Sequence, residues 1–361
     1  MIKGKTAFKF MQKQIAVLPG DGVGQEVTEQ AVKILETITK KFGHEFVFKE
    51  AVVGGVAIDK TGSALPDETM KLCLSSDAIL FGTIGDPKYD NNPKATIRPE
   101  QGILGLRKNL KLHTNIRPIF VFPTLINNSP LKTEIIKNVD FVVIRELVSG
   151  IYFGKRGRNK DRTYAFDTAE YSKEEISRVA KFAFEQAEKR KKKLTLVDKA
   201  NVLETSRLWR ETVLDMEKDF PLVTVDYMLV DNAAQQIIKN PGIFDVLLTE
   251  NMFGDILTDE ASVITGSLGM LPSASLGVGT ALYEPIHGSF PRATGQNIAN
   301  PIGSILSAAM MLEYSFGLRK ERDAIYNAVE KVLNKGFGTK DLSPKTILGT
   351  NELGEKIKET I

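Results

Sequence analysis

The fold is decided by the stretch Phe244–Glu260, which reads FDVLLTENMFGDILTDE. Its first five residues are largely apolar and predict a buried strand, and the polar residues that follow predict a turn into a helix near Asn251. Asp255 and Asp259 are then four residues apart and share one helical face at the end of the strand. Two such carboxylates suit Mg²⁺ or Mn²⁺, which take oxygen ligands from protein, water and substrate. Alone, the pair is more typical of acidic residues that stabilise a helix start.

The same change from apolar strand to polar residues recurs along the chain, and helical patterns lie between the strands. Alternating strands and helices predict an α/β fold with a large, mostly parallel twisted sheet flanked by helices, and with functional residues at the carboxyl ends of the strands. Residues 302–361 predict mainly two amphipathic helices, and residues 85–99 a long loop. The expected strands cover residues 14–18, 46–53, 78–82, 141–144, 194–197, 225–230 and 244–248, and the expected helices include residues 25–42, 67–75 and 172–189.

A glycine loop follows the first expected strand, with the sequence Pro19-Gly20-Asp21-Gly22-Val23-Gly24. Strand, glycine loop and helix together suggest dinucleotide binding. However, the glycines are spaced G-x-G-x-G instead of G-x-G-x-x-G, and no acidic residue closes the following strand at the expected distance. The glycines are equally suited to a tight turn. We therefore do not predict a Rossmann dinucleotide-binding fold.

Composition excludes several classes of function. The 361 residues include 48 Lys and Arg and 45 Asp and Glu, a net charge of +3 that favours no strongly charged partner. The basic run Lys189–Lys193 closes an amphipathic segment and suits a helix C-terminus. With no aromatic-interleaved basic patch and no zinc spacing, we predict no nucleic-acid partner.

A single cysteine, Cys73, precludes an intrachain disulfide and indicates a reducing compartment, the cytoplasm. No apolar run approaches the roughly 18 residues of a membrane span, so we predict no membrane association. Residues 1–13 lack the apolar core of a secretory signal, and we expect them to form an extension before the first strand.

Arginines are concentrated in one part of the chain: Arg98, Arg107, Arg117 and Arg145. Arg145 directly follows an expected strand. A guanidinium held at a strand end is a planar, bidentate clamp for a carboxylate or phosphate. A structural ion pair is as good an explanation for any one of them, but three converging arginines would indicate a substrate with more than one acid group.

Three more polar residues stand near expected strand ends. Tyr152 is either a core aromatic with a bonded hydroxyl or a proton donor. Lys199 follows the strand at 194–197 and is a candidate base, because apolar neighbours would desolvate its amine. Asp231 follows the strand at 225–230 and would add a third oxygen ligand to Asp255 and Asp259.

These segments together identify a resemblance. From Ile15 onward the chain is similar to the metal-dependent β-decarboxylating dehydrogenases, the isocitrate and isopropylmalate dehydrogenase family. The resemblance implies two domains with the site in the cleft between them. The first would comprise residues 1–112 and 266–361, and the second residues 113–265, with an arm near residues 150–170. The matching segments are LPGDGVGQEV, LRKNLKLHTNIRP, IRELVSGIYFG, VDKANVLETSRLWRE, residues 250–260, GSLGMLPSAS, EPIHGS and IANP.

The resemblance also implies roles for individual residues. Arg107, Arg117 and Arg145 would grip substrate carboxylates, and Tyr152 and Lys199 would be the catalytic pair. Lys199 and Asp231 would come from the neighbouring subunit of a homodimer, with Asp231 near both substrate and metal. The ligands of Mg²⁺ or Mn²⁺ would be Asp231, Asp255 and Asp259; the nicotinamide would lie near Glu100 and Asn201; and the adenosine would lie near His287, Gly288, Ser289, Phe290, Pro291, Arg292 and Asn300.

The substrate and cofactor follow from finer detail. Ile103, Leu104 and Val202 offer an apolar pocket that fits an isopropyl group, although apolar residues in the core would read the same. We therefore expect 3-isopropylmalate, with D-malate, tartrate or isocitrate as alternatives. A non-catalytic regulatory or RNA-binding relative is less favoured, because every catalytic and metal position is filled.

One departure concerns the cofactor. NAD-using relatives usually carry an aspartate for the adenosine ribose where this chain has Arg292, and an arginine there would accept a 2′-phosphate. NADP-using relatives carry a Lys-Tyr pair, and Ala293 supplies no tyrosine. We expect NAD.

Overall fold

The computed structural model describes residues 10–92 and 94–361. The chain folds into two compact units, one formed by the residues up to Ile103 together with Thr280–Ile361, and the other by Leu104–Gly279. The resemblance predicts crossings near residues 112 and 266 instead, and the roles it assigns to the two domains stay predictions. Most of the expected N-terminal extension lies outside the described residues, but Gln12 and Lys13 already belong to the first strand.

The first unit is built on four parallel strands in the order β2-β1-β3-β12. Every residue of β3 is buried, which explains its unbroken apolar sequence. The strands are β1 (Gln12–Gly20), β2 (Glu45–Glu50), β3 (Ala78–Thr83) and β12 (Leu282–Pro285), and the short helices are α2 (Gly55–Thr61), α3 (Asp67–Leu74) and α4 (Pro87–Asp90).

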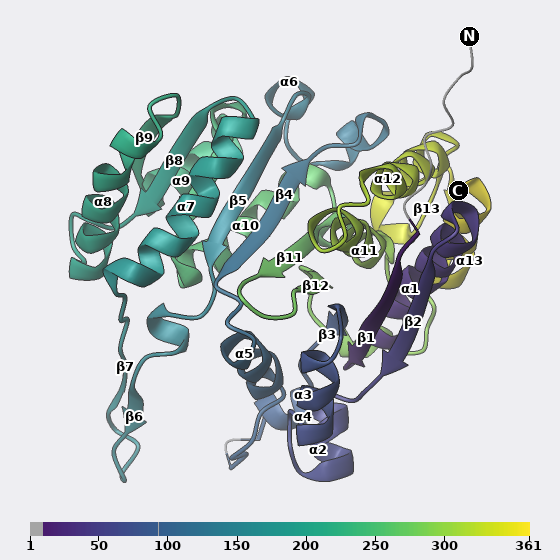
Figure 1. The fold of residues 1–361 in the computed structure, drawn as a ribbon, viewed down its shortest axis with the longest axis horizontal. Helices are drawn as coiled ribbons and strands as arrows, with labels where there is room; N and C mark the ends of the chain where they lie inside the picture. The colour runs from purple at the N-terminus through teal and green to yellow at the C-terminus, as the bar shows by residue number, and fades with distance from the viewer. Residues whose placement is uncertain (1–9, 93) are drawn as a thin grey trace. The chain divides into compact units, whose positions relative to one another are not determined.

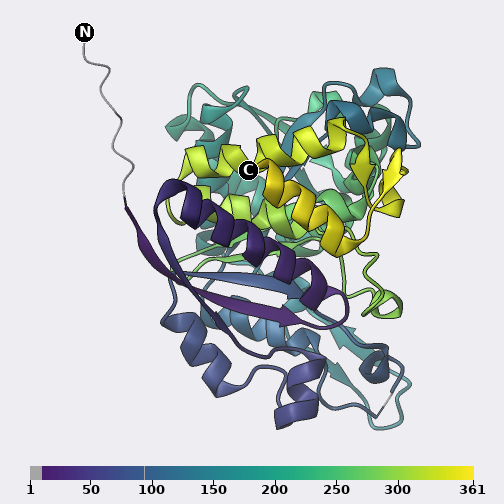
Figure 2. The same ribbon diagram turned by 90° about the vertical axis from the view of Figure 1, so that its right-hand side faces the viewer.

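Four longer helices of this unit lie side by side, although they come from opposite ends of the chain (Figure 2). They are α1 (Gly24–Phe42), α11 (Ile302–Tyr314), α12 (Arg319–Asn334) and α13 (Thr350–Thr360), and a small parallel pair, β13 (Phe337–Gly338) and β14 (Thr346–Ile347), follows α12. Two amphipathic helices were expected after residue 302, and α12 and α13 correspond to them, but the expectation missed a third helix, α11. Helix α11 is buried along almost its whole length, so it has no polar face to give an amphipathic pattern.

The second unit is built on six strands in the order β11-β4-β5-β10-β8-β9. The four strands from β5 to β9 are parallel, and β4 runs antiparallel to both of its neighbours. Together with the first unit's parallel strands, this confirms the predicted α/β class with mostly parallel strands. The strands are β4 (Thr114–Phe120), β5 (Asp140–Glu146), β8 (Lys193–Asp198), β9 (Thr224–Leu229), β10 (Val246–Thr249) and β11 (Pro272–Leu276).

Helices cover both faces of these six strands. In Figure 1, α7 (Lys173–Lys189) and α8 (Glu204–Met216) lie in front of them, and α9 (Val230–Lys239) and α10 (Asn251–Thr265) lie behind. Short α6 (Thr133–Ile136) follows β4, and α5 (Glu100–Asn109) carries the chain from the first unit into the second.

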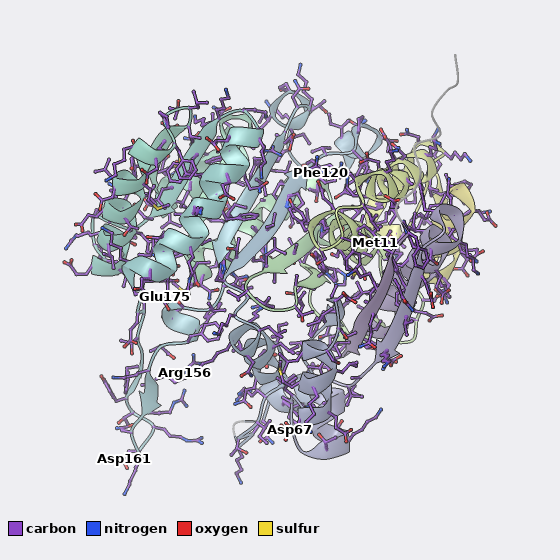
Figure 3. All side chains as sticks on the ribbon, viewed as in Figure 1. Met11, Asp67, Phe120, Arg156, Asp161 and Glu175 are labelled. Atoms are coloured by element: carbon purple, nitrogen blue, oxygen red, sulfur yellow. The ribbon has the colours of Figure 1, made fainter. Side chains whose placement is uncertain are left out.

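A hairpin arm leaves the second unit within the predicted region. It is the antiparallel pair β6 (Arg156–Arg158) and β7 (Ala165–Asp167). Arg156 and Asp161 lie along it in Figure 3. Within the described residues, no helix combines the length and apolarity that crossing a membrane requires.

Candidate functional site

The candidate site surrounds Asp255 on α10. The Nη1 atom of Arg145 donates to Asp255 Oδ1 at 2.6 Å, and Nη2 of Arg117 lies 3.5 Å from the same oxygen. The hydroxyl of Tyr152, in the short 3₁₀ helix Gly150–Tyr152, donates to Asp255 Oδ2 at 3.0 Å. Asp259, one turn further along α10, lies within the electrostatic reach of both arginines. Five residues that the sequence singled out separately are therefore neighbours.

Strand pairing explains why these residues meet. Thr249, the last residue of β10, pairs with Arg145 on β5, so Arg145 lies beside the point where α10 begins. On its other side, β5 pairs antiparallel with β4, which brings Arg117 to the same region. Glu250 then starts α10, because its side chain accepts a hydrogen bond from the backbone N–H of Phe253 at 2.8 Å. Asp255 and Asp259 are four residues apart in this helix, so their side chains lie on one face of it.

Two buried asparagines hold the arginines from behind, and sequence reasoning missed both. Asn251 Oδ1 accepts from Nε and Nη2 of Arg145 at 3.2 and 2.8 Å. Asn115 Oδ1 accepts from Nε of Arg117 at 2.6 Å, and Thr258 accepts from Nη1 of the same guanidinium. The available signal was a polar residue in or near an apolar segment: Asn115 within a buried strand, and Asn251 two residues after the end of one.

The electrostatics of the site follow from burial and from the close charges. Burial, and then the neighbouring Arg117, lower the pKa of Arg145 to about 10, and Asp255 partly offsets this. Burial acts to raise the pKa of Asp255, but Arg145 and Arg117 outweigh it, so the pKa lies below its usual value. Arg107 acts on both Arg145 and Asp255 in the same sense as Arg117.

Burial also acts on the remaining two groups. It raises the pKa of Asp259 above its usual value, although Arg117 opposes it. The pKa of Tyr152 is raised to about 12, first by burial and then by the adjacent Asp255. Tyr152 therefore keeps its proton at neutral pH.

The acidic residues fit a divalent cation only in part. Asp255 and Asp259 present two carboxylates from one helix face, and the side chain of Asp255 is 40% exposed. Two carboxylates are a sufficient protein contribution where water and substrate fill the other positions of Mg²⁺. Asp231, the expected third ligand, is not beside them. In the part of the chain that the structure describes, no three His, Cys, Asp or Glu residues are gathered closely enough to hold a metal ion.

Asp231 instead contacts Lys199. The Nζ atom of Lys199, after the end of β8, donates to Asp231 near the start of α9. Among the described residues, neither side chain bonds to Asp255 or Asp259. The Lys199 side chain is 29% exposed and paired with an acid. The catalytic role of Lys199 stays a prediction.

The glycine loop of the first unit has a structural use. The carboxylate of Asp21 is buried and accepts from the backbone N–H groups of Gly55, Val56 and Gly85 at 2.9, 2.9 and 3.0 Å. A carboxylate thus receives the backbone donors that a phosphate receives in dinucleotide-binding loops. This agrees with the conclusion from the glycine spacing that the segment is no Rossmann phosphate loop.

The same loop fixes the segment expected to bind adenosine. The N–H of Val23 donates to the carbonyl of Ser289 at 2.9 Å, and a Cβ on Gly22 would lie 2.0 Å from that oxygen. Only glycine allows this approach. Glu100, at the start of α5, lies near Ser289. A Cβ atom added to Gly85 would lie 3.5 Å from Oε1 of Glu100 and 3.4 Å from Oγ of Ser289, so both side chains approach the same glycine.

The rest of that segment is partly exposed. Phe290 has a left-handed backbone (φ 39°) and is 56% exposed. Arg292 is exposed in the 3₁₀ helix Pro291–Ala293, and Pro291 and Gly288 are exposed as well. Nδ1 of His287 lies 3.0 Å from the Gly288 carbonyl, and burial lowers the pKa of the ring. Asn300 accepts from the N–H of Ile302 at 3.0 Å, which caps the start of α11.

The three residues of the expected apolar pocket differ in their exposure. Ile103 is buried at 7% exposure, and Leu104 is half-buried on the same helix, α5. Val202 is 61% exposed in the turn between β8 and α8, next to exposed Asn201. The burial of Ile103 is what a residue of the hydrophobic core would show. The substrate pocket therefore stays a prediction.

Comparisons with known proteins agree on the family. The model of the isocitrate/isopropylmalate dehydrogenase family matches residues 14–357. The chain is 54% identical over 354 residues to 3-isopropylmalate dehydrogenase of Geobacillus kaustophilus (strain HTA426), covering 96% of this chain and 95% of the relative. It is 51% identical to that of Bacillus subtilis (strain 168), covering 97% and 98%.

Solved structures extend the likeness to the fold. Isocitrate dehydrogenase from Methylococcus capsulatus is similar with a TM-score of 0.86 at 32% identity, covering 96% of this chain and 99% of that one. A β-decarboxylating dehydrogenase from Thermococcus kodakarensis is similar with a TM-score of 0.78 at 34% identity, covering 96% of both chains. The chain therefore belongs to the isocitrate/isopropylmalate dehydrogenase family.

Proposed function

We propose that this protein is the NAD-dependent 3-isopropylmalate dehydrogenase of leucine biosynthesis. The reaction oxidises the 2-hydroxyl of 3-isopropylmalate, transfers hydride to the nicotinamide, and releases carbon dioxide to give 4-methyl-2-oxopentanoate. The relatives that share half of its residues over nearly the whole chain carry this name. The observation that carries the proposal is the meeting of Arg117, Arg145, Tyr152 and two carboxylates around the start of α10.

The arginines would bind the substrate. Arg117 and Arg145 both lie against the Asp255 carboxylate, which supports the proposal that their guanidinium groups receive an anionic oxygen. A carboxylate of 3-isopropylmalate would take that place, with Arg107 adding positive charge nearby. A substrate with two negative charges balances the positive charge of three guanidinium groups better than the single carboxylate of Asp255 does.

Asp255 and Asp259 would hold Mg²⁺ or Mn²⁺, completed by Asp231 of a second copy. When bound, such a cation supplies Lewis-acid stabilisation of the developing negative charge on the substrate's 2-oxygen. The two aspartates of α10 favour this role, because one is partly exposed and both lie beside the arginines that would hold the substrate.

Lys199 and Tyr152 would move the protons. Lys199, directly or through a relay, would accept the proton of the 2-hydroxyl while hydride leaves the same carbon. Loss of carbon dioxide from the resulting 2-oxo acid leaves an enolate, and Tyr152 would donate the proton that the carbon needs. The raised pKa of Tyr152, about 12, keeps that proton in place until then.

A second copy of the chain would complete the site. Lys199 and Asp231 are partly exposed and separate from the Asp255 contacts. Exposed apolar side chains occur on the same unit, at α8, α10 and the turn before α8, and a partner would cover them. They are Val202, Leu203, Leu214 and Ile256, at 61%, 40%, 57% and 60% exposure.

Free, buried Cys73 accords with a reducing, cytoplasmic compartment.

The testing experiment is absorbance at the reduced-nicotinamide band. Purified protein is mixed with 3-isopropylmalate and Mg²⁺, with NAD or NADP, and then with a chelator. We expect chelator-sensitive turnover with NAD. Turnover only with NADP would assign Arg292 to the 2′-phosphate and correct the cofactor. No turnover with either, together with activity on D-malate, tartrate or isocitrate, would refute the substrate.

A further inference from the structure

Arg145 is the most enclosed charge of the candidate site. Its side chain is 1% exposed, so its hydrogen bonds fix which edge faces the reacting molecules. Nε and Nη2 point at the single oxygen Oδ1 of Asn251, and Nη1 points at Asp255. The guanidinium is therefore oriented by an amide on one edge and presents its Nη1 atom on the other.

Asn251 is itself held firmly. Its side-chain Nδ2 donates to the carbonyl of Ser149 at 3.1 Å, and its backbone N–H donates to the hydroxyl of Tyr171 at 3.0 Å. The residue has 0% exposure. Arginine can only donate and a carbonyl oxygen can only accept, so the two amide ends cannot exchange places. The oxygen must face Arg145.

Other well-buried arginine partners in this unit are carboxylates. Asp198 accepts from Nε and Nη2 of Arg210 at 2.9 and 2.8 Å, and its side chain is 2% exposed. Asp245, equally buried, accepts from Nε of Arg190 at 2.8 Å. Neither of these carboxylates contacts Arg117, Arg145 or Tyr152. A carboxylate on the guanidinium edge neutralises the arginine, which suits an arginine that only supports the fold.

The two arginines of the candidate site differ from these. The Nε edges of Arg145 and Arg117 face the neutral amides of Asn251 and Asn115. An amide orients the guanidinium and leaves its positive charge for an anion on the opposite edge. This distinction in the chemistry of the backing group is independent of any sequence resemblance.

We propose that Asn251 is a positioning residue for substrate binding, which aims Nη1 of Arg145 at a substrate carboxylate without itself neutralising the charge of Arg145. The inference rests on the proposed role of Arg145. Loss of one hydrogen bond to a charged group corresponds to about a ten- to a hundredfold change in affinity. The inference therefore predicts a change of that size in substrate affinity alone.

The test uses two variants of Asn251 and measures the substrate KM, the cofactor KM, kcat and the thermal midpoint, with isopropylmalate as substrate and NAD as cofactor. Asn251→Asp keeps an acceptor for Arg145 but neutralises it, and Asn251→Ala keeps the charge but loses the orientation. We expect the substrate KM to rise about ten- to a hundredfold in both, with the cofactor KM within about twofold. Asn240→Asp is the matched control, because it adds the same charge at an exposed residue of α9's C-terminus; it should leave both KM values and kcat unchanged, and the unfavourable helix dipole should lower the thermal midpoint only slightly.

Arg145→Gln separates failure of the inference from failure of the proposed function. If Arg145→Gln abolishes substrate binding while both Asn251 variants keep the wild-type substrate KM, Asn251 has no positioning role and the proposed function stands. If Arg145→Gln itself keeps the wild-type substrate KM, the role proposed for Arg145 fails. Should Asn251→Asp not fold because its carboxylate faces the Ser149 carbonyl, Asn251→Ala decides. A fall in thermal midpoint and kcat with an unchanged substrate KM would mark Asn251 as structural only and overturn the proposal.

Discussion

Tyr152 is the residue whose chemistry the structure specifies most closely. Its raised pKa, about 12, makes it a proton donor and not a base across ordinary assay conditions. For Tyr152→Phe we expect kcat to fall by about 10²–10⁴, the usual contribution of general acid catalysis, with the substrate KM changed only a few fold. Steady-state kinetics with isopropylmalate and NAD measure both. A variant that turns over at the wild-type rate would remove Tyr152 from the mechanism.

Asp21 has the most concentrated structural role of any single side chain in the first unit. It accepts three backbone N–H groups, and an amide in its place has one acceptor oxygen fewer. We expect Asp21→Asn to destabilise the first unit by about 1–3 kcal/mol. Thermal unfolding by circular dichroism tests this, and fluorescence of the single tryptophan, Trp209, follows the second unit as an internal comparison.

Individual residues were predictable where the residue type itself carries the chemistry. Asp255 and Asp259 were found from their spacing, and Arg145 from its place after a strand. Asn251 was not, because an asparagine after a strand is common and its importance lies in its partner. That partner is fixed by the pairing of β10 with β5, a contact between segments about a hundred residues apart that no local pattern records.

At the level of elements, helix α10 contains a glycine, Gly254, although glycine disfavours a helix interior. A Cβ on Gly254 would lie 2.7 to 3.1 Å from the Cβ, Cγ and Cδ atoms of buried Arg145. Alanine would favour the helix by about 1 kcal/mol, but Arg145 would have to move. For Gly254→Ala we expect an intact circular dichroism spectrum and a substrate KM raised about tenfold or more. An unchanged substrate KM would show that Arg145 tolerates the displacement.

Strand β5 ends on a carboxyl group that burial keeps protonated near neutrality. Glu146 is fully buried, and burial raises its pKa to about 7 from the ordinary 4.5, against two backbone N–H donors. Because the folded state holds the proton more tightly than the unfolded state, its contribution is complete below pH 4.5 and is lost as pH rises to about 7. The upper limit of this loss is about 3 kcal/mol.

The check is denaturant unfolding at pH 5 and pH 8, followed by Trp209 fluorescence, in the wild type and in Glu146→Gln. We expect the wild type to lose more stability than the variant between the two values. Equal losses would mean that Glu146 does not titrate in this window. The comparison with the variant at the same two pH values cancels the effect of other groups that titrate in this window, such as His113, whose pKa burial lowers.

The succession of elements was largely predictable because each strand and helix carries its own periodicity. Helix α1 and strand β10 lie within one or two residues of their predicted bounds. Helix α11 was not distinguished from its amphipathic neighbours, because burial on all sides erases the polar face that periodicity detects. Within the expected long loop, α4 begins at a proline and needs only the side chain of Asp86 to cap it.

For the whole molecule, the proposed dimer makes a quantitative prediction. If each active site combines Lys199 of one copy with Arg145 of the other, Lys199→Ala and Arg145→Gln remove residues that the two different chains contribute to a site. Each variant alone should be inactive. Random reassociation of equal amounts should restore about a quarter of the sites, since half of the dimers would be mixed and each would hold one intact site. No recovery, with mixed dimers demonstrated by differential tagging, would place both residues in one chain.

Sequence predicted the α/β class of the molecule but not the order of its strands. Sheet order depends on which strands pair, and β11 and β4 illustrate this, since more than 150 residues separate Asn115 from its partner Ser275. The division of the chain into compact units likewise depends on long-range contacts, and the domain bounds that the resemblance implies stay a prediction.

The neutral amide that orients Arg145 also suggests a way to search protein structures for anion-binding sites. A buried arginine whose inner edge meets an acid is electrically complete, and selection on it concerns folding alone. A buried arginine that meets an asparagine, as Arg145 does, keeps its charge for an anion on its opposite edge, where Asp255 lies here. Scanning structures of proteins without assigned activity for amide-backed arginines would rank candidate anion sites, even where pockets are too open to stand out.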